Sequence, residues 1–177
     1  MSILNFQKPE KILLQKADDF EGTFEFKPLE PGFGQTIGNS LRRILLSSLE
    51  GYAISAIRIA GVDHEFSTIK GVVEDVVDII LNIKQIRLKP VVVTEGAEEE
   101  KIYVTISGKD KFLAGDIETN TNVFKVMNPD LYICTMEPNV TLEIEFTITK
   151  GRGYVPADEG LSKDAAIGVI PVDAIYT

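Results

Sequence analysis

Short runs of apolar residues that alternate with polar ones, separated by glycine, proline, asparagine and acidic clusters, dominate most of this chain. Such runs predict β-strands that are buried on one face. The first two lie on either side of Asp18 and Asp19, a pair typical of a turn. The predicted strands are 11–17, 22–27, 53–61, 86–93, 101–107, 122–127, 131–136, 140–149 and a last apolar strand within 166–177.

Two segments have helical spacing of their apolar residues instead. From 36 to 50, residues placed at about 100° intervals gather on one broad apolar arc, and Gly51 stands where a left-handed C-cap is expected. The arc contains Ile37, Leu41, Ile44, Leu45, Ser48 and Leu49. The second helix is predicted within 71–86, with Val72, Val76, Ile79, Ile80 and Ile83 on its apolar side.

Leu46 lies away from the arc of the first predicted helix. It follows Arg43 at the i, i+3 spacing that brings two helical side chains together. Arginine beside an apolar residue is typical of protein interfaces. The pair therefore indicates a binding anchor; the alternative is a helix that the same chain covers on both sides.

Composition limits the class of protein. The chain has 177 residues, of which 44% are hydrophobic, enough to fill a real core. Its net charge of -9 and sequence pI near 4.7 argue against direct binding to nucleic acid. The single cysteine, Cys134, lies in the apolar run LYICTM and is expected to be a packed thiol. No secretory signal or membrane-spanning run is evident, which favours the cytoplasm.

Three glycines offer a candidate nucleotide site. Gly32, Gly34 and Gly38 match a loose GxGxxxG between predicted strands, so a nucleotide-binding oxidoreductase is one alternative. A dinucleotide site, however, needs a strand that runs directly into the first glycine, and here PLEP intervenes. Turn formation and close packing explain these glycines better.

Other candidate chemistry is sparse. His64 beside Glu65 lacks the second histidine of an HExxH zinc site and is expected to be a hydrogen-bonded loop residue. Three acids, Glu74, Asp75 and Asp78, could gather a hard cation but are expected to form a solvated helix face. The sequence contains no nucleophile elbow, phosphate-binding GxxxxGK or paired CxxC. We therefore expect no metal, no cofactor and no catalytic residues.

Three longer motifs carry a family resemblance: GFGQTIGNSLRRILLSSLEG, GVDHEFSTIKGVVEDVVDIILNIK, and GRGYVPA followed by IPVDAIYT. From about Pro28 onward they resemble, in order, the amino-terminal domain of the bacterial DNA-directed RNA polymerase alpha subunit family. The resemblance implies an α+β fold in two lobes: a discontinuous α/β dimerisation lobe, residues 1–52 and 166–177, and an inserted, mostly β lobe, residues 53–165.

The resemblance also implies a function. The family's domain is a non-catalytic scaffold within a nucleotidyltransferase: it dimerises and assembles the beta and beta prime subunits. By analogy, the apolar arc, without Ser48, would form the dimer interface. Arg43 and Leu46 would face beta, while Lys84 and Val172 would belong to the surface met by beta prime.

The family's domain continues beyond VDAIYT with a further long helix, then a linker and a DNA-binding domain. The resemblance thus implies a fragment or shortened variant, with an incomplete dimerisation lobe and no direct DNA contact. A free-standing interaction module with an unrelated partner is a further alternative.

Overall fold

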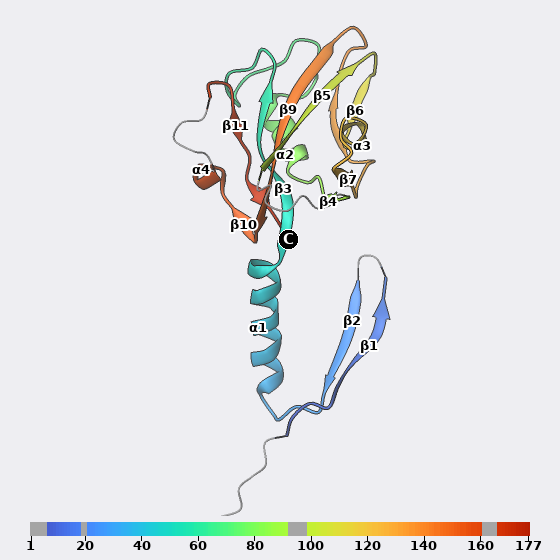
Figure 1. Ribbon diagram of the computed structural model, residues 1–177, viewed down its shortest axis with the longest axis vertical. Coiled ribbons are helices and arrows are strands. Elements are labelled where there is room, and N and C mark those ends of the chain that lie inside the picture. The colour runs from blue at the N-terminus through green and yellow to red at the C-terminus, as the bar shows by residue number, and fades with distance from the viewer. Residues whose placement is uncertain (1–6, 19–20, 92–98, 161–165) are drawn as a thin grey trace, which may run out of the picture. The chain divides into compact units, whose positions relative to one another are not determined.

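The computed structural model describes residues 7–18, 21–91, 99–160 and 166–177 (Figure 1). The chain divides into two compact units, Met1–Leu45 and Leu46–Thr177. Asp19, the last two residues of the strand predicted at 86–93 and residues 161–165 lie outside the described residues. The predicted α+β class is confirmed by the mixture of helices and antiparallel sheet.

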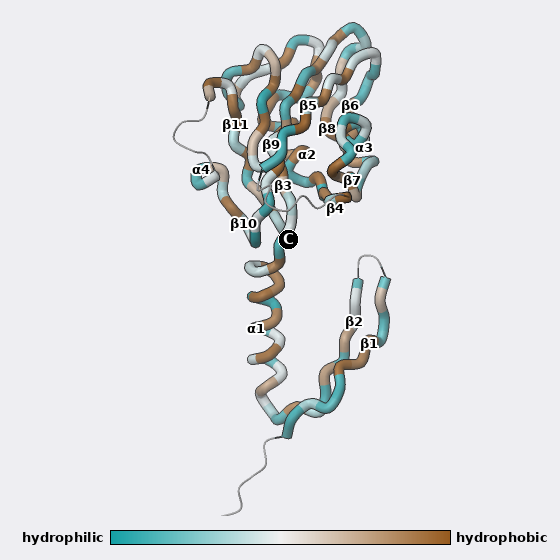
Figure 2. The backbone as a smooth tube through the Cα atoms, in the orientation of Figure 1, coloured by the Kyte–Doolittle hydropathy of each residue, from teal (hydrophilic) through white to brown (hydrophobic). Residues whose placement is uncertain are grey.

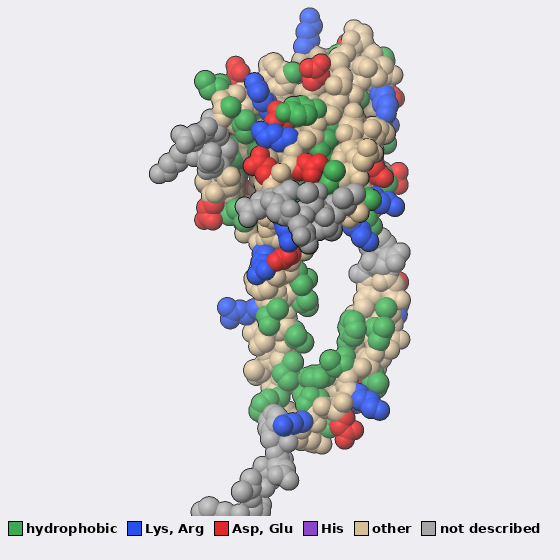
Figure 3. Space-filling model, in the orientation of Figure 1, with side chains coloured by type: hydrophobic (Ala, Val, Ile, Leu, Met, Phe, Trp, Pro, Cys, Tyr) green, Lys and Arg blue, Asp and Glu red, His purple; other side chains and the backbone are tan. Residues whose placement is uncertain are grey.

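The first unit begins with a hairpin of two antiparallel strands, β1 (Lys11–Ala17) and β2 (Gly22–Lys27), as predicted. Lys11 pairs with Lys27, and an irregularity in register falls between Leu14 and Lys16. Apolar side chains are exposed on this hairpin, as Figure 3 shows for the visible face. They are Ile12, Leu13, Leu14 and Phe24.

A turn leads into helix α1 (Phe33–Ser48). The Phe33 N–H donates to the Glu30 carbonyl at 3.1 Å, and Gly32 has φ 89°, a conformation that favours glycine. The predicted C-cap role of Gly51 is wrong. The helix ends at Ser48, and Gly51 lies inside the following strand without a positive φ.

The second unit is built on a six-stranded antiparallel sheet with the order β5-β9-β3-β4-β7, in which β11 also pairs with β3. The long strands β3 and β9 form its centre. Side chains of β9 alternate between buried and more accessible positions, whereas β3 has adjacent buried residues on either side of an irregularity in register between Ile54 and Ala56. The hydropathy colours of Figure 2 follow the alternation along β9. The strands are β3 (Glu50–Ile59), β4 (Leu88–Pro90), β5 (Glu99–Ser107), β7 (Phe124–Val126), β9 (Thr141–Arg152) and β11 (Ile170–Pro171).

The core lies on one face of this sheet. Phe146 of β9 and Ile57 of β3 are fully buried, and Ile102 of β5 lies opposite Phe146 in register. Burial of such side chains contributes about 1.5–3 kcal/mol each. Helix α2 (Val76–Ile83) and the pair β6 (Lys111–Leu113) and β8 (Tyr132–Thr135) add to the same core through Val76, Ile79, Ile83, Phe112 and Ile133.

Helix α2 begins later than its apolar spacing predicted. Asp75 is its N-cap, and the Asp75 carboxylate accepts a hydrogen bond from the Asp78 N–H at 2.8 Å. A side-chain acceptor at this position satisfies an N–H group that the helix itself leaves unpaired. Val72 and Glu74 therefore precede the helix, and Val72 forms an isolated bridge with Met136.

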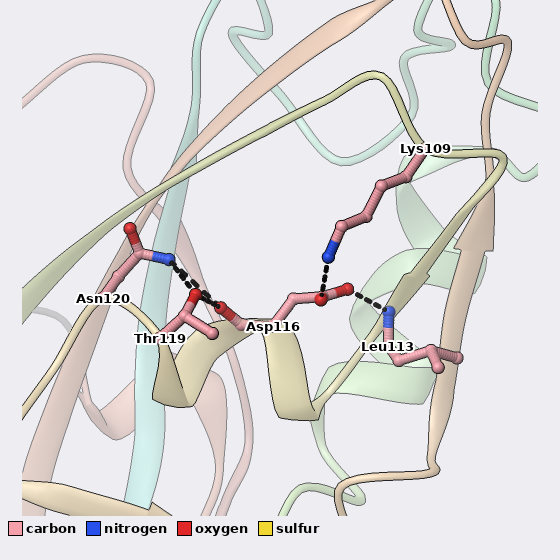
Figure 4. A network of polar contacts seen from close by, with 5 residues as sticks. All are labelled: Lys109, Leu113, Asp116, Thr119 and Asn120. Carbon is pink, nitrogen blue, oxygen red and sulfur yellow. Dashed lines mark hydrogen bonds and ion pairs between the residues drawn. The ribbon is translucent and has the colours of Figure 1, made fainter.

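The short helix α3 (Gly115–Glu118) is held by Asp116 (Figure 4). The Asp116 carboxylate accepts from the Lys109 ammonium and, at 3.0 Å, from the Leu113 N–H. Its carbonyl accepts from the side chains of Thr119 and Asn120. Local polar contacts thus stabilise a helix too short to be stable alone.

Residues 166–177 pack within the second unit. Strand β11 pairs with β3, while β12 (Ala174–Ile175) pairs with β10 (Tyr154–Val155), which precedes helix α4 (Ala157–Gly160). Figure 1 marks the C-terminus beside the start of β3. The grouping of this segment with residues 1–52 in a dimerisation lobe stays a prediction.

Candidate protein-interaction surfaces

Helix α1 is amphipathic, yet none of its residues is buried. On the predicted arc, Leu41, Ile44, Leu45 and Leu49 each expose at least half of their surface, and Ile37 is half-buried. The alternative that the same chain covers this helix on both sides stays a prediction. A helix with an apolar arc is stable when a neighbour covers that arc.

The predicted anchor pair is exposed as well. Leu46 is 54% exposed, and Arg43 lies one turn before it in α1. The two residues carry an apolar and a cationic group at adjacent positions of one helix face. This arrangement fits a partner that offers an apolar pocket with acidic groups beside it.

A second surface forms where α2 ends. Lys84 is the C-cap residue of α2, and its ammonium donates to Asp173 Oδ2 at 2.6 Å. The Ala157 N–H donates to the other carboxylate oxygen of Asp173 at 2.9 Å. The Lys84 hydrogen bond, followed by that from Ala157, lowers the pKa of Asp173. Asp173 thereby joins three segments that are far apart in the chain.

Val172 does not present its side chain on this surface. It is 3% exposed, and its N–H donates to the Ser55 carbonyl at 2.9 Å. Because β11 places it against β3, the valine is a core residue, and the charged groups near it, Lys84 and Asp173, are half-buried. The assignment of Val172 to the surface met by beta prime stays a prediction. Sequence spacing missed Asp173, which lies 89 residues after Lys84.

A cluster of charges lies at the start of β3. The Glu50 carboxylate accepts from Lys150 at 2.8 Å and from the guanidinium of Arg152, its direct partner on β9. Hydrogen bonds from Lys150 and Arg152 lower the pKa of Glu50 to about 2. The sequence contained no signal for this cluster, because strand register alone brings the three residues together.

The glycine-rich entry to α1 is not a nucleotide-binding loop. Gly32 lies in the turn, but Gly34 and Gly38 are within the helix. The strand before them belongs to an antiparallel hairpin and ends at Lys27. A dinucleotide fingerprint instead places its glycines between a parallel strand and the helix N-terminus. The oxidoreductase alternative is therefore not supported.

The remaining candidate residues have structural partners. His64 Nδ1 and Ser67 Oγ share a hydrogen bond of 3.2 Å, as expected of a loop histidine. Glu74 departs from the predicted solvated face: its carboxylate accepts from the Thr135 N–H at 2.7 Å and from the Tyr132 hydroxyl. No group of three or more metal-binding side chains gathers among the described residues.

Cys134 is fully buried, and burial raises the pKa of its thiol to about 12. The prediction of a packed thiol is confirmed, and a raised pKa disfavours the nucleophilic thiolate. In the described parts of the chain, no helix has both the length and the apolar character needed to cross a membrane.

The fold and its surfaces define an α+β domain. It exposes apolar side chains on helix α1 and has a charged contact where α2 ends. Residues 57–177 match the family model described as the RNA polymerase Rpb3/RpoA insert domain. That match covers more than half of the chain, and the chain belongs to this family.

Relatives with the name "DNA-directed RNA polymerase subunit alpha" are similar over all 177 residues. Identity is 55% with the Flavobacterium psychrophilum protein, 57% with that of Bacteroides fragilis and 44% with that of Salinibacter ruber. The chain spans 53% of the length of each of these relatives.

Proposed function

We propose that this chain is a non-catalytic scaffold subunit of a bacterial DNA-directed RNA polymerase, which dimerises and assembles the beta and beta prime subunits in the cytoplasm. The observation that carries the proposal is helix α1, which has apolar residues on several sides and no buried residue in its own chain. Family membership over residues 57–177 supports the polymerase context.

Each of these surfaces is assigned to one partner. The α1 arc, Ile37, Leu41, Ile44, Leu45 and Leu49, packs against a second copy of the chain. Arg43 and Leu46 contact the beta subunit. Lys84, with Asp173 beside it, contacts beta prime, while Val172 supports that surface from the core.

Co-expression with the beta and beta prime subunits of the same organism tests the proposal. We expect an affinity-tagged 177-residue chain to retain both large subunits through purification. The control is the double variant Arg43→Ala and Lys84→Ala, which removes one cation from each proposed surface and is expected to lose both. An unrelated interaction module would retain neither large subunit, and that result would refute the proposal.

A further inference from the structure

Two glycines face each other at the end of the central sheet. Gly51 of β3 pairs directly with Gly151 of β9, and neither has a positive φ. Their backbone conformations would therefore accept other residues. Glycine inside a strand lowers its stability and often marks the close approach of another segment.

The residue that approaches both glycines closely is Tyr176. A Cβ added at Gly51 would lie 1.9 Å from the Tyr176 carbonyl oxygen, and one added at Gly151 would lie 2.5 Å from the Tyr176 ring. Because real Cβ atoms do not make such contacts, any side chain at either position would displace Tyr176. The two glycines thus form a seat: Gly51 receives the backbone, and Gly151 receives the ring.

Polar contacts hold Tyr176 in this seat. Its hydroxyl shares a hydrogen bond of 2.7 Å with Thr149 Oγ1, two residues before Gly151 on β9. Its N–H donates to the Gly153 carbonyl at 2.8 Å. Gly153, with φ 63°, lies against the last turn of α1, where an added Cβ would be 3.3 Å from the Ser47 backbone. The motif GRGY therefore places one glycine under the tyrosine ring and the other against α1.

The seated Tyr176 lies close to Asp173 along the chain. Between Asp173 and Tyr176 are only the two residues of β12, whose partner β10 is itself a short strand. On the other side, the Val172 N–H bonds to Ser55. A two-residue strand contributes little stability alone. Tyr176 is thus a fixed point on one side of Asp173, and Val172 is a fixed point on the other.

We propose that Tyr176, seated on Gly51 and Gly151, is a positioning residue for the surface formed by Lys84 and Asp173. This inference rests on the proposed beta prime surface. Tyr176 itself does not contact the partner. It maintains the local order of residues 172–176, so that Asp173 stays beside Lys84 on the surface that the partner meets.

Hydrogen exchange in the 177-residue chain tests the seat. Gly151→Ala displaces the Tyr176 ring. Tyr176→Phe removes only the hydroxyl contact with Thr149, and this milder variant is used if Gly151→Ala folds poorly. We expect amide exchange at Val172 and Tyr176 to become about tenfold faster in Gly151→Ala. Exchange in the paired strands β5 and β9 around Phe146 should stay unchanged. Gly160→Ala is the matched control, because an added Cβ there has no neighbour within 4 Å.

Retention of beta prime then separates positioning from simple packing. We expect about tenfold weaker binding for Gly151→Ala and a smaller loss for Tyr176→Phe. Unchanged exchange in both variants would overturn the inference. A second result would also overturn it. In that result, Gly151→Ala exchanges faster but binds beta prime normally, while Lys84→Ala weakens beta prime binding. If Lys84→Ala also binds normally, the proposed beta prime surface is itself wrong, and the positioning role is rejected with it.

Discussion

Single side chains in this protein owe their properties to partners distant in the chain. Glu50 illustrates this at the start of β3, where Lys150 and Arg152 meet one carboxylate. The two cations favour the ionised form of Glu50, so its pKa falls to about 2. Because the cluster is exposed, salt is expected to weaken it.

The pH dependence of stability follows from this shift. A lowered pKa in the folded state stabilises the fold above the ordinary value of 4.5, and this contribution is lost as the pH falls toward about 2. We therefore expect Glu50→Gln to be less stable than the unmodified chain at pH 7, with a difference that disappears near pH 2. Urea unfolding across this range measures it. In Lys150→Ala, an NMR titration should show the pKa of Glu50 moving back toward 4.5; an unmoved titration would contradict the assignment.

Glu74 offers a second prediction for a single residue. Burial raises its pKa, but the hydrogen bonds from Tyr132 and Thr135 outweigh burial, and the net shift is downward. Glu74→Ala leaves the Thr135 N–H without its acceptor, which costs about 1–3 kcal/mol. Thermal or urea unfolding measures the loss. Asp63→Asn, in an exposed loop, is the control and should change stability by about 0.5 kcal/mol or less. Equal effects of the two changes would show that the Glu74 contacts contribute nothing.

At the scale of elements, α1 differs from α2. Three residues of α2 are buried, and its role is to fill the core, whereas α1 has none. Substitutions on α1 should therefore affect partners more than the fold. The helix nevertheless begins at a defined residue, directly after the Gly32 turn, and this fixes which of its side chains lie on the same face.

We expect Arg43→Ala and Leu46→Ala to leave the melting temperature nearly unchanged and to weaken binding of the beta subunit. A loss of about 2 kcal/mol, typical of an interface hot spot, corresponds to roughly 30-fold weaker binding. A pull-down titration with the beta subunit measures the effect. Leu41→Ala is the matched control, because this leucine lies on the arc assigned to the second copy. The assignment of this face would be wrong if Arg43→Ala unfolded the chain or left beta binding intact.

At the scale of the whole molecule, exposed apolar side chains are the main feature of the first unit. The hairpin exposes Ile12 and Phe24, and α1 adds the leucines of its arc. Patches of this kind mark interaction sites or cause aggregation.

We therefore expect concentration-dependent self-association through α1. Sedimentation velocity across a dilution series should show a growing dimer fraction, and the double variant Leu41→Glu and Leu45→Glu should stay monomeric. A strict monomer at every concentration, together with no binding of an apolar dye, would contradict this prediction.

Much of the secondary structure could be predicted from the sequence, because alternation and helical spacing report which side of an element is apolar. This worked for β1, β2, β9 and α1. It failed where a local side chain competes with periodicity. Val72 fits the helical spacing of α2, but Asp75 caps the helix and places Val72 before it. Gly51 was predicted to be a helix cap, but it is a strand residue, and only glycine leaves room there for the Tyr176 backbone.

The sequence by itself determined the α+β class, the position of Arg43 and Leu46 on α1 away from the apolar arc, and the family motifs. These depend on neighbours within a few turns or strand residues. Only the tertiary structure decided that Val172 is buried, that Asp173 pairs with Lys84, and that Gly51 and Gly151 seat Tyr176. Each of those contacts joins residues far apart in the chain. Strand register sets such contacts, and the local pattern of hydrophobic and polar residues contains no record of which distant strand becomes the neighbour.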